Sequence, residues 1–142
     1  MNSKSVTAAR LALGLVFFVF GWNGFLHFIP APPPSGTMAT FASGLFASGY
    51  FFPFLKGTEI LAGTLLLSKR YVPLALAVLA PIVLNIVAVH LFLAPSGLPL
   101  AFLVLALEIF LAWSYRAVYR PMLQARPEPA RAPKPELAHA AE

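Results

Sequence analysis

Four long apolar runs, joined by short charged or proline-rich connections, set the strongest limit on how this 142-residue chain can fold. Charged residues make up only 11% of the chain, whereas a soluble domain carries about 25%. In lipid every backbone polar group must be satisfied internally, and a helix needs about 20 apolar residues to cross. The runs therefore predict an all-α integral membrane protein.

We expect a four-helix transmembrane bundle within a single domain, residues 1–120. The predicted spans are 7–29, 53–68, 72–93 and 100–115. The first run could be mistaken for a signal peptide, but it is too long, and a proline cluster beginning at Pro30 follows it instead of a small-residue cleavage site. It is therefore interpreted as a retained helix.

The segment 35–52, between the first two spans, contains no charged residue. Phe41, Leu45 and Phe46 have the spacing of one helical face, and the segment ends in three consecutive aromatic residues, as an interfacial belt would. This pattern predicts a short interfacial or re-entrant helix, which would act as a lid on the bundle.

After Arg120 the composition changes, since prolines alternate with alanine, arginine and glutamate. Such a segment cannot bury a core, so 121–142 is predicted to be a disordered tail. The cations in the connections and tail all fall on one side of a four-span protein: Lys4, Arg10, Lys69, Arg70, Arg116, Arg120, Arg126, Arg131 and Lys134. This pattern predicts that both termini lie in the cytoplasm, and we expect the membrane to be a bacterial inner membrane.

Seven polar residues lie within or at the ends of the apolar runs, where each costs roughly 2.5–3.5 kcal/mol to insert at the bilayer centre. We predict that they form one layer in the outer half of the bundle and bind a ligand. They are Asn23, His27, Lys56, Glu59, Asn85, His90 and Glu108.

Within this set, Glu59 and His90 are the best candidates for a catalytic role. The pair Lys56 and Glu59, three residues apart, could equally be a structural ion pair along one helix. Asn23 and Asn85 could simply join helices by hydrogen bonds. His27 could be a solvated residue at the membrane surface.

Several chemistries are disfavoured by the sequence. The chain has no cysteine, which excludes disulfides and thiolate metal sites, and it has no phosphate-binding glycine loop. The histidines and glutamates lack a ligand spacing such as Glu-x-x-His, so we predict neither a metal nor haem. The positive net charge lies in the connections and the tail, so it indicates membrane topology and does not support a nucleic-acid partner.

The order of motifs resembles the DoxX and DoxX-like family of small four-span membrane proteins. The resemblance covers 10–123 and rests on three groups of residues: Gly21-x-Asn23 with Leu26-His27-Phe28; Leu55-Lys56-x-x-Glu59-x-x-x-Gly63; and Pro81-x-x-x-Asn85 with His90-Leu91-Phe92-Leu93 and Glu108. One departure is Gly24, where many family members have a lysine that Lys56 could replace here.

The resemblance implies membrane subunits linked to quinone oxidation or oxidative-stress complexes, or, in one branch, an assembly chaperone. The leading hypothesis is a protein that binds a small apolar ligand such as a quinone, as a subunit of a redox complex. The alternative is a non-enzymatic membrane scaffold or assembly factor. A proton or ion path is a weaker third hypothesis. We expect the lipid bilayer as one partner, with a second copy or a membrane-complex protein as another.

Overall fold

The computed structural model describes residues 2–126, and all regular structure in that part of the chain is helical. The five longer helices are α1 (Ser3–Leu26), α2 (Gly36–Ala47), α3 (Phe51–Leu67), α4 (Val72–Phe92) and α5 (Leu98–Ser114). Three short helices complete the chain: η1 (Pro95–Gly97), α6 (Arg116–Tyr119) and η2 (Arg120–Leu123).

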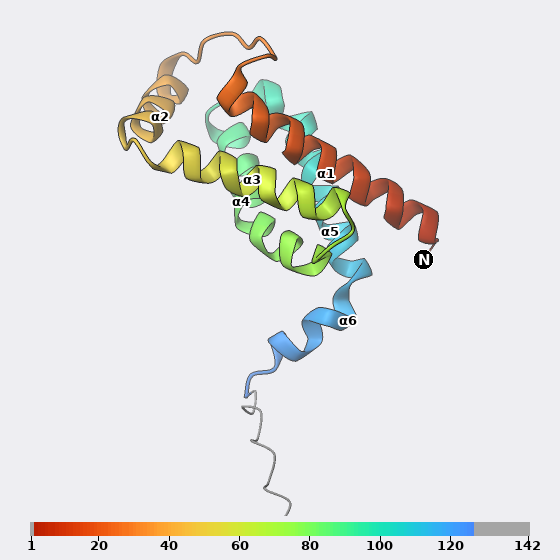
Figure 1. The fold of residues 1–142 in the computed structure, drawn as a ribbon. Helices are drawn as coiled ribbons and strands as arrows, with labels where there is room; N and C mark the ends of the chain where they lie inside the picture. The colour runs from red at the N-terminus through yellow and green to blue at the C-terminus, as the bar shows by residue number, and fades with distance from the viewer. Residues whose placement is uncertain (1, 127–142) are drawn as a thin grey trace, which may run out of the picture.

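Four helices pack in a closed ring, in which α1 contacts α3, α3 contacts α4, α4 contacts α5, and α5 returns to α1. The pairs α1–α3 and α4–α5 lie side by side along most of their lengths (Figure 1). The centre of the ring is filled by fully buried side chains from all four helices: Leu13, Phe17, Leu66, Leu76, Leu79, Val83 and Leu111. The outer faces remain apolar and exposed, as lipid contact requires.

The lengths and composition of the helices agree with a membrane bundle. Helices α1, α4 and the continuous segment Pro95–Ser114 are each long and apolar enough to cross a bilayer. Helices α2 and α3 pass the same test only as a pair, and they meet at an angle of 90°. The predicted fold class, a membrane-integral helical bundle with a bent element between the first two spans, is confirmed.

Close contact between α1 and α3 depends on glycine. A Cβ atom at Gly63 would lie 2.6 Å from the backbone nitrogen of Phe18, and one at Gly21 would lie 2.7 Å from the Ile60 side chain. Such small residues let two helix backbones approach in a membrane, where van der Waals packing drives association. This close approach places the first turns of α3 against the last turns of α1.

The two cations in the first half of α1 have different environments, because Lys4 is exposed whereas Arg10 is buried. The Arg10 guanidinium donates to the carbonyl oxygens of Leu66 and Leu67, at the carboxyl end of α3. Arg10 is therefore more than a cation of the connections, because it is a buried donor that caps the end of a neighbouring helix. The Leu66 carbonyl also accepts the N–H of Lys69 at 3.2 Å. We call this end of the bundle, with Lys4, Lys69 and Arg70, the basic end.

The end of the chain differs from the predicted tail. Residues Arg120–Leu123 form the short helix η2, although disorder was expected from residue 121 onward. Proline is favoured in the first turn of a helix, where its missing N–H has no partner anyway, and Pro121 occupies that place. The remainder of the predicted tail, 127–142, lies outside the described residues.

Candidate functional site

A cavity of about 250 Å³ lies between α1, α3, α4 and α5, in the half of the bundle away from the basic end. Three of the predicted site residues line it: Lys56 and Glu59 from α3, and His90 from α4. The rest of the wall is apolar and consists of Val16, Phe17, Phe20, Ile86, Leu100, Ala101 and Val104. The structure thus brings residues of α3 and α4 that are distant in the sequence into one pocket.

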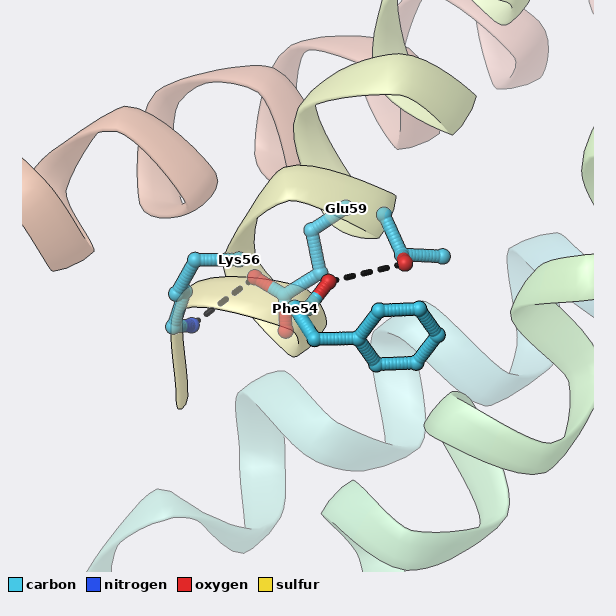
Figure 2. Close-up of polar contacts among 4 residues, drawn as sticks. Phe54, Lys56 and Glu59 are labelled. Atoms are coloured by element: carbon cyan, nitrogen blue, oxygen red, sulfur yellow. Dashed lines mark hydrogen bonds and ion pairs between the residues drawn. The ribbon is translucent and has the colours of Figure 1, made fainter. Parts of the chain in front are cut away.

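Lys56 and Glu59 form an ion pair, with 2.8 Å between the lysine Nζ and the glutamate Oε2. Figure 2 shows both side chains on neighbouring turns of α3. The glutamate side chain is 5% exposed and the lysine side chain 19% exposed. A largely buried carboxylate with a cation at hydrogen-bond distance recovers part of the cost of removing both charges from water.

The path of the Lys56 side chain accounts for a glycine at position 24. A Cβ atom at Gly24 would lie 2.6 Å from both Cγ and Cδ of Lys56. The lysine stem therefore occupies the space that a side chain at position 24 would need. The cation of this site therefore comes from α3, and Gly24 of α1 leaves the space that its side chain occupies.

His90 is held by two local features. Its Nδ1 lies 2.8 Å from the carbonyl oxygen of Ile86, and since a carbonyl can only accept, Nδ1 carries the hydrogen. In the neutral imidazole with this hydrogen, Nε2 is the acceptor nitrogen. The ring also packs against Gly97, where any Cβ atom would overlap Cδ2 and Nε2. Gly97 was not among the predicted site residues, because only the fold brings η1 against α4.

Asn23 and His27 have structural roles at the end of α1. The Asn23 side-chain oxygen accepts the N–H of Ile29 at 2.6 Å, and its backbone oxygen accepts the N–H of His27 at 2.9 Å. His27 ends the helix in the left-handed conformation with φ 52°, and it is exposed. Neither residue lines the cavity. Together they turn the chain from α1 into the proline-rich connection.

Asn85 and Glu108 lie elsewhere. Asn85 is exposed in a groove of about 350 Å³ between α3 and α4. Glu108 lines a separate cavity toward the basic end, between α4 and α5. The seven polar groups therefore do not meet in one site, because counting residues from the helix ends estimates depth but not the direction in which each side chain points.

Helix α2 does not close the cavity. It has no buried residue, and no residue of 35–52 lines the pocket. Phe52, at the end of this segment, links α2 to the ion pair. Its ring centroid lies 5.9 Å from the Lys56 Nζ and 4.4 Å from the ring centroid of Phe46. The segment predicted as a lid instead packs beside the start of α3.

Comparisons with protein-family models, with curated proteins and with solved structures gave no match. The site must therefore be interpreted from its own geometry. Within residues 2–126, no three His, Cys, Asp or Glu side chains gather as they would around a metal ion. The cavity combines one ammonium group, one carboxyl group and one imidazole acceptor inside apolar walls.

Proposed function

We propose that this chain is a DoxX-like protein of the bacterial inner membrane that binds the ring of a small planar apolar molecule, such as a quinone, beside Lys56, Glu59 and His90. The observation that carries the proposal is the grouping of these three side chains in one apolar cavity between four helices. Binding sites for small molecules are typically apolar with a few convergent polar groups.

The polar groups suit both redox states of a quinone. The Lys56 ammonium has three N–H donors, and the ion pair with Glu59 uses one of them. A second donor can serve a quinone carbonyl. The acceptor nitrogen of neutral His90 can instead take the hydroxyl hydrogen of the reduced form, so the two residues would hold opposite edges of the ring.

The chain has no cysteine and so no dithiol relay of its own, and electrons would have to come from a partner or a cofactor. We therefore propose that it serves as the ligand-binding subunit of a redox or oxidative-stress complex. Glu59 and His90 would exchange protons with the ligand, and Lys56 would balance the carboxylate. The grouping of cations at one end of the bundle supports an orientation with both termini in the cytoplasm.

The test begins with lipid extraction from protein purified out of its native membrane, followed by mass spectrometry for enriched quinones. Thermal shifts with a short-chain quinone and its quinol are then compared between the wild type and the variants Glu59→Gln and His90→Leu. Both variants should lower the shift. The matched control Asn85→Ala, in a separate groove, should retain it. No enrichment and no ligand-dependent shift would reject the proposal.

The alternative function, a scaffold or assembly factor, is favoured by one observation. Helix α2 lies outside the ring without a buried residue. Phe46 within it and Tyr50 just after it are 56% and 70% exposed. A partner protein could cover this surface. In that case Glu59→Gln would reduce the yield of folded protein, because the ion pair would serve only the bundle, and quinone would cause no shift.

A further inference from the structure

A second cavity, of about 660 Å³, lies toward the basic end and shares no lining residue with the first. Its walls come from α4 and α5, and residues of α6 and η2 form its rim. Apart from Glu108 and the rim residues Arg116 and Tyr119, the lining is apolar or aromatic. Its volume lies within the range of roughly 300–1,000 Å³ that is usual for small-molecule sites.

Glu108 is the polar group inside this cavity. The residue is 5% exposed, and its Oε2 has no hydrogen-bond partner among residues 2–126. Buried polar atoms in proteins almost always have a partner, so an unpartnered one needs an explanation. Glu108 lines the cavity and its buried Oε2 lacks a donor, so a ligand with a donor group that reaches this carboxyl group would complete it.

The two polar rim residues are engaged elsewhere. Arg116 donates to the carbonyl oxygen of Trp113 at 3.0 Å, and its guanidinium lies 5.2 Å from the centroid of the Trp113 ring. The Tyr119 hydroxyl donates to the carbonyl oxygen of Pro73 at 2.6 Å. Burial and the nearby Glu108 and Tyr115 raise the pKa of Tyr119 to about 12, so its hydroxyl remains a donor. Neither residue is bonded to Glu108.

We propose that this cavity binds a lipophilic amine, whose ammonium group pairs with Glu108 while its apolar body lies between α4 and α5. A charged donor is favoured over an alcohol because hydrogen bonds between ionised groups are roughly twice as strong as neutral ones. The apolar wall made by residues such as Leu76, Val83 and Leu105 suits a hydrocarbon or aromatic body. A lipid tail alone would fill the space but leave the carboxyl oxygen without a partner.

The test measures saturable binding of radiolabelled biphenylmethylamine to the full-length protein in lipid nanodiscs. The matching alcohol and methylbiphenyl, which share the same body, compete against it. The amine should bind roughly tenfold more tightly than methylbiphenyl, and Glu108→Gln should remove most of that difference. Glu59→Gln, which alters only the first cavity, should leave amine binding unchanged, so failure of the quinone proposal would not affect this one.

A second variant guards against misfolding of Glu108→Gln. Ala80→Phe fills the cavity while keeping the carboxyl group, and it should also abolish saturable amine binding. Equal affinity for the amine and methylbiphenyl would show that the space is only a lipid-filled crevice. Amine binding that survives in both variants would likewise overturn the proposal.

Discussion

At the scale of single residues, several polar side chains in this protein hold turns and helix ends. Asn23 and His27 close the end of α1, where the histidine adopts a left-handed conformation that glycine adopts most readily. Arg10 caps the end of α3 from a neighbouring helix. Such residues attract attention in an apolar sequence, yet their partners are backbone groups.

The turn after α1 gives the first prediction. Asn23→Ala should destabilise the protein by about 1 kcal/mol, because the Ile29 N–H loses its acceptor. His27→Gly should be neutral or slightly stabilising, since glycine takes φ 52° without strain. Denaturant unfolding in detergent would measure both variants. A loss of quinone binding in His27→Gly with stability unchanged would show a ligand role that the geometry does not support.

The helix-end contacts of Arg10 give the second prediction. Arg10→Met should cost about 2 kcal/mol, because hydrogen bonds to charged groups contribute roughly 1.5–3 kcal/mol. The Leu67 carbonyl would lose the guanidinium, and the Leu66 carbonyl would keep only the Lys69 N–H at 3.2 Å. The matched variant Lys4→Met removes an exposed charge near the same end and should have little effect. Equal stability of the two variants in the same unfolding assay would contradict this role for Arg10.

Gly97 offers a residue-scale test of the first cavity. Gly97→Ala should push the His90 ring away from its position, since the added Cβ atom would overlap Cδ2 and Nε2. The backbone at Gly97 has φ −89°, which alanine adopts freely, so the effect would come from the side chain. Quinone affinity should fall while the helix content by circular dichroism stays constant. Unchanged affinity would mean that the position of His90 is irrelevant to binding.

At the scale of helices, the α1–α3 interface sets the geometry of the Lys56–Glu59 pair. Glycines on both helices let the backbones approach, and this brings Lys56 over Gly24 and Glu59 into the cavity. The pairing of α4 with α5 does the same for Glu108. Each carboxyl group is thus positioned by a helix pair. Glu59, at the α1–α3 interface, is paired with Lys56, whereas Glu108, between α4 and α5, lines a cavity.

The fourth prediction concerns this interface. Gly63→Ala should destabilise the bundle by roughly 1–3 kcal/mol, because the new methyl group would lie 2.6 Å from the backbone of α1 and overpacking costs that much. The control is Gly57→Ala on the same helix, where no atom lies within 4 Å and alanine favours the helix. Thermal unfolding of both variants would measure the difference, and equal melting temperatures would refute close packing at Gly63.

At the scale of the whole molecule, the ring of four helices separates two ends with different chemistry. The basic end contains Lys4, Lys69 and Arg70, and the opposite end consists of uncharged connections. The two cavities lie in different halves of the bundle, so two ligands could bind without competing. Helix α2 lies beside the ring, where it can rest on the membrane surface.

Membrane orientation is the prediction at this scale. Because the chain has no cysteine, single cysteines at Ser3, Ser35 and Ser96 can be labelled with a membrane-impermeant maleimide in intact cells. Ser35 and Ser96 should react from outside, and Ser3 only after the membrane is opened. Reaction at Ser3 alone in intact cells would reverse the proposed orientation.

The residues alone were enough to predict the membrane class and the helical bundle with its bent element. Hydropathy and helix-breaking prolines determine where each helix begins and ends from nearby residues alone, so these features can be recognised without knowledge of how the helices pack. The partnership of Lys56 with Glu59 was also accessible, because it follows from helical spacing. His90 was recognised as a candidate, but its place beside that pair depends on how α4 packs.

The seven polar residues of the apolar helices fall into four groups once the helices are packed. Lys56, Glu59 and His90 share a cavity, Asn23 and His27 end a helix, Glu108 lines its own cavity, and Asn85 lies exposed in a groove between α3 and α4. Sequence spacing gives the depth of a residue along its helix, and many side chains share the same depth. The rotation of each helix about its axis is set by packing against its neighbours, and that rotation determines which side chains meet.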